Sequence, residues 1–173
     1  QPCSSAASDV YKRQAISSEK MKKINLAEVV KSVVDDFNSV YDTKKSIAIN
    51  FKTNGQNNYE ILGIENRIEQ IIANLLENSI SFSEKNQAID VELAKKEEDK
   101  ITLIVSDEGV GFNENDTNKI FNRFYSNRPE KFGEHSGLGL NIVKNLVEIH
   151  GGEITASNNE DKGARIEINF PKA

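Results

Sequence analysis

The ten residues Asn74–Ser83, NLLENSISFS, constrain the fold more than any other part of this sequence. In a helix over 67–81, with about 100° between successive residues, four polar side chains fall within about a third of the circumference. These are Asn74, Glu77, Asn78 and Ser81. The other side carries the apolar residues Ile68, Ile71, Ile72, Leu75 and Phe82. The segment is therefore predicted to be an amphipathic helix with one buried face and one polar stripe.

The polar stripe offers oxygen ligands to a hard cation. Mg²⁺ retains most of its waters and takes its remaining oxygens from a few protein groups and from substrate phosphates. Carboxamide oxygens one helical turn apart, from Asn74 and Asn78, therefore make a candidate magnesium site. The alternative is that these residues are only the solvent-facing side of an amphipathic helix.

The length, composition and net charge of the chain limit the classes of protein to which it can belong. With 173 residues, of which 37% are hydrophobic and 28% charged, the chain is expected to form one soluble globular domain. A net charge of −5 argues against a general nucleic-acid or anionic-membrane surface. The single Cys3 cannot form an internal disulfide, and no apolar run approaches the roughly 18–20 residues of a membrane span.

Hydrophobic periodicity predicts a mixed order of helices and strands. Further helices are expected over 27–41 and 138–150, and strands over 24–26, 46–52, 59–62, 88–95, 100–106, 153–157 and 164–170. Two hairpins are expected, at 88–106 and 153–170, and a turn at 53–58 leads back into a strand. This order predicts an α+β fold, a two-layer sandwich whose mixed, mostly antiparallel sheet carries helices on one face.

The sequence DEGVGF follows the predicted strand 100–106 directly. A carboxylate at the end of a buried strand, Asp107, is suited to accepting a hydrogen bond from an exocyclic amine such as that of adenine. Gly109 and Gly111 would let a flat ring approach the backbone. The alternative is an ordinary Asp-Gly turn that ends a strand.

The helix 138–150 begins with the sequence SGLGL, which comprises Ser136, Gly137, Leu138, Gly139 and Leu140. Free N–H groups and the positive end of the helix dipole make such a start a candidate phosphate site. It is neither a Walker A loop nor a dinucleotide fingerprint, because the lysine and the third glycine of those motifs are absent.

The long irregular segment 107–136 contains aromatic and cationic residues that could form a lid. Phe121, Phe124 and Tyr125 could close over a nucleotide and bring Arg123 or Arg128 to its phosphates. The alternative is that the aromatic rings anchor the segment to the core while the cations stay in solvent.

Taken in order, NLLENSISFS, DEGVGF, FNRFY and SGLGLNIV resemble the N, G1, F and G2 boxes of the catalytic ATP-binding domain of two-component sensor histidine kinases. That domain has the Bergerat fold shared by gyrase, Hsp90, histidine kinases and MutL. The resemblance covers about residues 24–171, and residues 123–152 look most like the envelope-sensing kinases of alphaproteobacteria.

The resemblance implies ATP and Mg²⁺ as ligands. Asn78 would coordinate Mg²⁺ with Asn74 nearby, Asp107 would read adenine between Gly109 and Gly111, and Gly137 and Gly139 would flank the phosphates. Glu77 would hold a metal-bound water. Ser81 stands where the family carries Lys or Arg, so Arg123, Arg128 or Lys131 would contact the phosphates instead.

The implied reaction is transfer of the ATP γ-phosphoryl to a histidine on a dimerisation domain, for onward transfer to a response regulator. Neither histidine here stands in the acceptor context: His135 lies on the presumed lid, and His150 ends a helix, where the dipole favours a charged ring. The expected parts are a non-native or disordered tail (1–15), a remnant of the dimerisation helix (16–23) and the catalytic domain (24–173). The domain is expected to be cytoplasmic, in a parent homodimer of the inner membrane.

Two alternatives share the fold. One is a protein-serine kinase of the anti-sigma type, against which the FNRFY segment argues. The other is a nucleotide-binding docking module without transferase activity, which the replacement at Ser81 makes credible.

Overall fold

The computed structural model describes residues 19–55, 58–113, 117–123, 125 and 139–173. Its elements, in chain order, are β1 (Lys22–Asn25), α2 (Leu26–Lys45), β2 (Ala48–Thr53), β3 (Glu60–Gly63), α3 (Glu65–Phe82), β4 (Ala88–Glu97), β5 (Lys100–Asp107), the 3₁₀ helix η1 (Thr117–Phe121), α4 (Gly139–Ile149), β6 (Glu153–Asn158) and β7 (Ala164–Pro171). Within these described residues, no helix is both long and apolar enough to span a bilayer.

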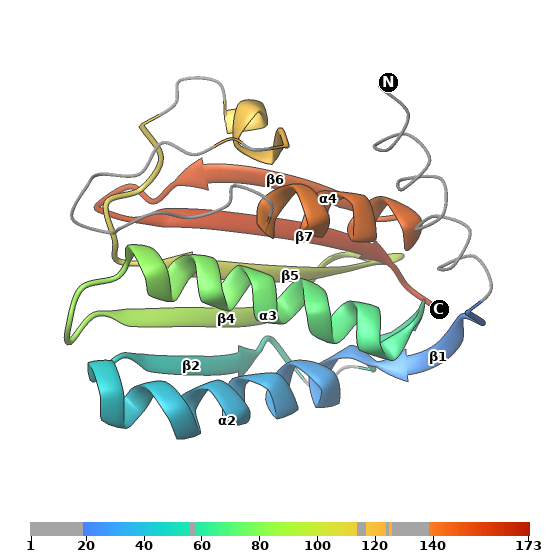
Figure 1. Ribbon diagram of the computed structural model, residues 1–173. Coiled ribbons are helices and arrows are strands. Elements are labelled where there is room, and N and C mark those ends of the chain that lie inside the picture. The colour runs from blue at the N-terminus through green and yellow to red at the C-terminus, as the bar shows by residue number, and fades with distance from the viewer. Residues whose placement is uncertain (1–18, 56–57, 114–116, 124, 126–138) are drawn as a thin grey trace, which may run out of the picture.

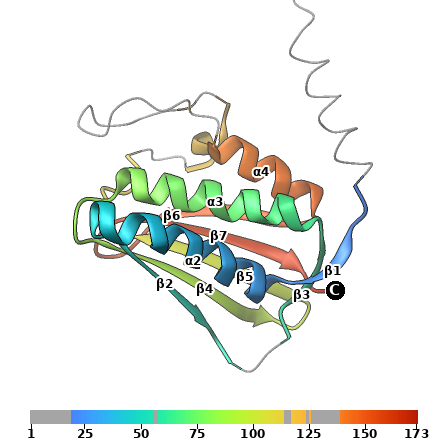
Figure 2. The same cartoon turned by 60° about the horizontal axis from the view of Figure 1, so that its bottom comes forward.

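Five strands form the main sheet in the order β2-β4-β5-β7-β6. The β2–β4 pair is parallel, and the other three pairs are antiparallel. Figures 1 and 2 show α2, α3 and α4 together on one face of this sheet, with α3 and α4 running antiparallel. The predicted two-layer sandwich with a mixed, mostly antiparallel sheet is therefore confirmed.

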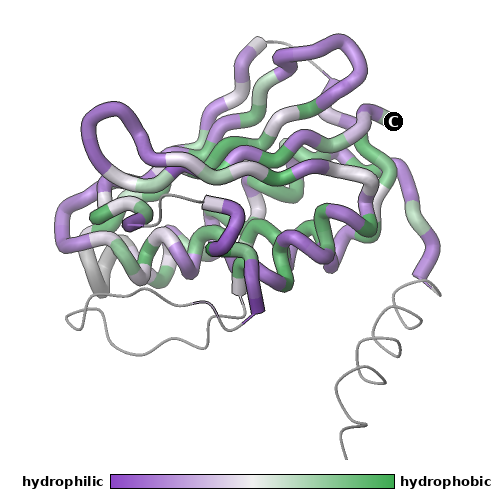
Figure 3. Tube along the Cα trace, turned by 90° about the horizontal axis from the view of Figure 1, so that it is seen from above, coloured by the Kyte–Doolittle hydropathy of each residue, from purple (hydrophilic) through white to green (hydrophobic). Residues whose placement is uncertain are grey.

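The core lies between the helices and the sheet. Inward-facing residues alternate along the strands, such as Ile89, Val91 and Leu93 on β4, each fully buried. Figure 3 shows hydrophobic residues recurring along both layers, while the connecting loops are mostly hydrophilic. Burial of these side chains is the main stabilising contribution, at about 25 cal/mol per Å² of apolar surface.

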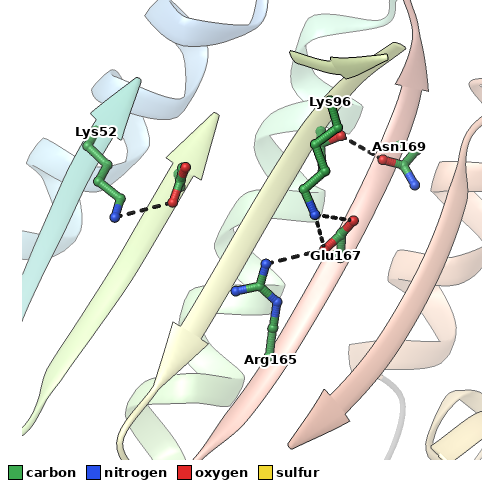
Figure 4. Close-up of polar contacts among 7 residues, drawn as sticks. Lys52, Lys96, Arg165, Glu167 and Asn169 are labelled. Carbon is green, nitrogen blue, oxygen red and sulfur yellow. Dashed lines mark hydrogen bonds and ion pairs between the residues drawn. The ribbon is translucent and has the colours of Figure 1, made fainter. Parts of the chain in front are cut away.

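The opposite face of the sheet carries cross-strand polar pairs (Figure 4). Nζ of Lys96 lies 2.8 Å from the carboxylate of Glu167, which also contacts Arg165 at 3.3 Å. Lys52 pairs with Glu92 at 3.2 Å. Partly exposed pairs of this kind each contribute about 1 kcal/mol or less, so this face serves mainly to keep the sheet solvated.

The first strands are arranged differently from the expectation. The turn after β2 does not close a hairpin, because β2 pairs with β4 while β3 pairs with β1 in a separate two-stranded sheet. Lys22 and Lys23, assigned from the sequence to a helix remnant over 16–23, lie in strand β1. The alternating pattern is the same for any strand partner, so it could not identify these pairs.

The role predicted for His150 was wrong. Its ring is 6% exposed, and Nε2 accepts a hydrogen bond from the N–H of Ile64 at 3.1 Å. The ring proton must then lie on Nδ1, which donates to the carbonyl of Leu146 at 2.7 Å. Burial lowers the pKa of His150, so the ring is neutral and satisfies the N–H of Ile64, the N-cap residue of α3, which makes no side-chain cap bond of its own.

Candidate functional site

Helix α3 presents the predicted polar stripe. Asn74, Asn78 and Ser81 are half-buried and Glu77 is exposed, while Ile68, Ile71, Ile72 and Leu75 on the other side are buried. Phe82 is only half-buried, because it lies at the last residue of the helix. The amphipathic helix is therefore confirmed, and it extends slightly beyond the predicted 67–81.

The carboxamides of Asn74 and Asn78 lie on the half-buried polar stripe of α3. Among the described residues, the structure records no hydrogen bond to either side chain, whereas the hydroxyl of Ser81 donates back to the carbonyl of Asn78 at 2.7 Å. Ser81 is therefore engaged with its own helix. The carboxamide oxygens remain as acceptors on the stripe.

Asp107 ends strand β5 with its side chain turned into the protein, 4% exposed. Its Oδ1 accepts hydrogen bonds from the N–H groups of Gly109 at 2.9 Å and Ala164 at 3.1 Å, and the hydroxyl of Ser79 also bonds the carboxylate. Burial raises the pKa of the Asp107 carboxyl above its ordinary value, and these three hydrogen bonds oppose that effect. A buried, oriented carboxylate of this kind suits recognition of an amine donor.

The two glycines after Asp107 are fixed by close packing. A Cβ at Gly109 would lie 2.6 Å from the carbonyl oxygen of Phe82, and one at Gly111 would lie 2.7 Å from Oδ1 of Asn158. Gly111 also has φ +74°, which disfavours other residues. The loop can therefore lie tightly between the end of α3 and the β6–β7 turn only with glycine at these positions.

Several supporting residues were not identified from the sequence. Ser79 lies on the buried face of α3, where a serine gives no signal of its partner. Gly163 has φ +98°, and a Cβ there would lie 1.8 Å from the carbonyl oxygen of Asp107. Asn158, the last residue of β6, and Asn159, the first residue of the β6–β7 turn, also contact the loop. The sequence does show a glycine near the end of this turn. It does not show that the glycine contacts Asp107, because the two residues are far apart in the chain.

The start of α4 carries Gly139 and Leu140, both half-buried. Asn141 on the first turn donates a hydrogen bond to the carbonyl of Phe121 at 3.0 Å and so connects α4 to η1. The side chain of Phe121 is 4% exposed, which favours the alternative in which this ring anchors its segment to the core.

The other predicted lid and phosphate residues are placed only in part. Arg123 is exposed and Tyr125 is half-buried. The remaining ones lie outside the described residues, namely Phe124, Arg128, Lys131, His135, Ser136, Gly137 and Leu138. Their predicted roles stay predictions.

The donor set of the stripe decides which metal fits. Within the described ranges, no group of three or more His, Cys, Asp or Glu could hold an ion. Two carboxamides and the exposed Glu77 carboxylate are hard oxygen ligands, too few to enclose a cation. They fit Mg²⁺, which completes its shell with water and substrate oxygens.

The family described as "Histidine kinase-, DNA gyrase B-, and HSP90-like ATPase" matches residues 63–173. The sensor protein ChvG of Agrobacterium fabrum, an alphaproteobacterium, is 38% identical over 162 residues. That alignment covers 87% of this chain and 27% of ChvG, so the chain spans about a quarter of its relative's length.

Solved structures give the same result for the fold. The nucleotide-free catalytic domain of the histidine kinase ThkA superposes with a TM-score of 0.77 at 26% identity, covering 88% of this chain and 98% of that one. ThkA in complex with the response regulator protein TrrA superposes with a TM-score of 0.74 at 25% identity, covering 98% of this chain and 48% of that one.

Proposed function

Because this chain belongs to the histidine kinase-, DNA gyrase B- and HSP90-like ATPase family, we propose that it binds Mg²⁺-ATP and transfers the γ-phosphoryl to a histidine on a dimerisation domain. One observation carries the proposal. The polar stripe and the buried carboxylate of Asp107 meet at the same end of α3, toward which the N-terminus of antiparallel α4 is directed (Figure 1).

Each part of the site has one task. Asp107 accepts a hydrogen bond from the amine of adenine, and the close packing of Gly109 and Gly111 shapes the pocket for the ring. Asn78 and Asn74 hold Mg²⁺, which neutralises phosphate charge when bound. The N–H groups at the start of α4, near Gly139, bind phosphate oxygens.

The proposed phosphoryl transfer requires little covalent chemistry from the residues of this chain. A neutral histidine nitrogen on the dimerisation domain attacks the γ-phosphorus, the bond to the β-phosphate oxygen breaks, and ADP leaves. Catalysis is then positioning and charge neutralisation. A cation from the segment of Arg123 replaces the basic residue that Ser81 does not supply.

The protein partners of this domain are inferred from its relatives. ChvG is a sensor protein and ThkA is a histidine kinase solved in complex with a response regulator. We therefore infer that the phosphorylated histidine passes its phosphoryl group to a response regulator. The parent protein is proposed to be a membrane-bound homodimer with this domain in the cytoplasm.

Nucleotide binding is the first test. Titration calorimetry should give heat for ATP with Mg²⁺, and Asn78→Ala should weaken the Kd at least about tenfold, a loss of 1.4 kcal/mol. The matched control is Asn50→Ala, since Asn50 is an exposed asparagine that bonds Asp90 on the open face of the sheet. No heat from wild-type chain, or equal effects of both variants, would refute the proposed site.

Transfer is the second test, with labelled ATP and a separately expressed dimerisation domain. Acid-labile, alkali-stable label on that domain supports the histidine kinase, and acid-stable label would indicate a serine kinase. The docking-module alternative is favoured by the hydroxyl of Ser81, which bonds its own helix and offers no charge to a phosphate. Tight ATP binding without any label would support that alternative.

A further inference from the structure

The β6–β7 turn holds both ends of the loop that carries Asp107. Asn158 binds the main chain of Phe112 twice: its Oδ1 accepts from the N–H at 2.7 Å, and its Nδ2 donates to the carbonyl at 2.9 Å. Asn159 donates from Nδ2 to the carbonyl of Asp107 at 2.9 Å. Two adjacent amide side chains therefore fix the first and last residues of a six-residue loop.

The same turn also sets the direction of the carboxylate. Both backbone donors to Asp107, the N–H groups of Gly109 and Ala164, bond the same oxygen, Oδ1. With the Asp107 carbonyl held by Asn159 and its Oδ1 held by Ala164, main chain and side chain are tied to one turn. Together with the Ser79 hydroxyl from α3, these contacts determine the direction of the second oxygen, Oδ2.

We propose that Asn158 and Asn159 are positioning residues for nucleobase selection, which orient Asp107 toward the amine of adenine without touching the nucleotide. This inference rests on the proposed function, because it assumes that Asp107 reads the base. Its substrate class is the 6-amino purine nucleotides, as opposed to 6-oxo purines, whose carbonyl would face a carboxylate.

A purely structural role predicts a different result. The two bonds of Asn158 lie at the surface, so water can replace them after truncation and the fold should lose little stability. The expected effect is instead on loop geometry, and hence on the discrimination between bases. Selectivity measured as a ratio of two Kd values separates these roles.

The chain offers a matched control in Asn38. Its amide binds the main chain of Ile49 by the same two bonds, at 3.0 Å to the N–H and 2.9 Å to the carbonyl. These bonds join α2 to β2, which β4 separates from β5 and its Asp107 end, and they are more buried than those of Asn158. Asn38→Ala should therefore lose at least as much stability as Asn158→Ala, with base selectivity unchanged.

The experiment measures Kd for ATP and for GTP, with Mg²⁺, and urea unfolding for each variant of the full chain. Asn158→Ala and Asn159→Ala should each lower the GTP/ATP Kd ratio about tenfold, and Asn38→Ala less than twofold. Asn158→Asp keeps the acceptor for the Phe112 N–H but sets a carboxylate oxygen against the Phe112 carbonyl, so it should lower the ratio at least as much as Asn158→Ala does.

The outcomes separate this inference from the function on which it rests. If wild-type chain binds neither nucleotide, the proposed function fails and the inference falls with it. If wild type prefers ATP but Asn158→Ala and Asn159→Ala shift the ratio no more than Asn38→Ala does, the proposed function stands and the positioning role is refuted.

Discussion

The two ends of helix α3 are held by different means. At its N-terminal end, the cap residue Ile64 has no side-chain hydrogen bond to offer. Its own N–H is bound by His150, a residue 86 positions later on another element. This buried long-range contact makes the N-terminal end of the helix sensitive to anything that changes the charge of the His150 ring.

At the C-terminal end, the helix uses its own side chains. The hydroxyl of Ser81 bonds the carbonyl of Asn78 at 2.7 Å, and that of Ser83 bonds the carbonyl of Ser79 at 2.8 Å. The carbonyl of Ser79 is one of the last four that a helix end leaves unpaired, so the Ser83 hydroxyl satisfies it locally. The carboxamide of Asn78 is left out of this hydrogen bonding.

The two ends lie about 27 Å apart for 18 residues at 1.5 Å each. One end is built for stability and carries no ligand group, and the other is adjacent to the Asp107 carboxylate. Stability should therefore depend mainly on the N-terminal end of α3 and nucleotide binding on its C-terminal end. Variants at the two ends should change these two quantities separately.

The largest effect is expected from Asp107→Asn at the C-terminal end. The variant amide keeps an oxygen for the two backbone donors but presents no second acceptor to adenine. A hydrogen bond to a charged group contributes about 1.5–3 kcal/mol, so ATP should bind about ten- to a hundredfold more weakly in calorimetry.

The same variant should not lose stability at neutral pH. The pKa of Asp107 is raised in the folded protein, so the unfolded chain ionises first and stability falls as the pH rises through the folded pKa. The uncharged amide avoids this loss. Urea unfolding should show an equal or greater free energy for Asp107→Asn at pH 7, with an advantage that shrinks toward pH 3.8. A variant that is less stable at pH 7 would contradict the separation.

The second effect is expected at the N-terminal end, from His150→Ala. It leaves the N–H of Ile64 without its acceptor, which costs about 1–3 kcal/mol, and ATP affinity should stay within twofold. The pKa of His150 is lowered, so the unfolded chain takes up the proton first. The contribution of His150 is complete above its ordinary value of 6.5 and is lost as the pH falls through the folded pKa.

The measurement is urea unfolding of wild type and His150→Ala from pH 8 to pH 5. The difference in unfolding free energy should shrink on acidification, by at most about 1.4 kcal/mol per pH unit. His135 and the carboxylates are present in both proteins and cancel. A constant difference across this range would mean that the ring has the same pKa in the folded and unfolded chains, which would contradict the neutral buried ring.

This comparison also separates what the sequence predicts from what it cannot. The stripe of α3 follows from the spacing of its own residues, and the position of Asp107 follows from the apolar strand before it. Both depend on local periodicity, so both were predictable.

The unpredicted features all join distant segments. His150 binds Ile64, and Asn158 binds Phe112 across 46 positions. A histidine before two glycines and an asparagine in a polar turn each look like ordinary helix and loop ends. Their partners are determined by packing of the whole sandwich, which periodicity does not encode.

The smallest effect is expected at Asn25, which caps α2 with its own side chain. Its Oδ1 accepts from the N–H of Ala27 at 3.1 Å, a local cap bond of a kind that Ile64 does not make for α3. Asn25→Ala should therefore cost about 1 kcal/mol, and Asn25→Ser, which keeps a capping oxygen, only a few tenths. Because no titrating ring takes part in this cap, the loss should be the same at pH 5.5 and pH 8. If Asn25→Ala instead lost different amounts of stability at pH 5.5 and pH 8, the proposed difference between the side-chain cap of α2 and the histidine contact of α3 would be wrong.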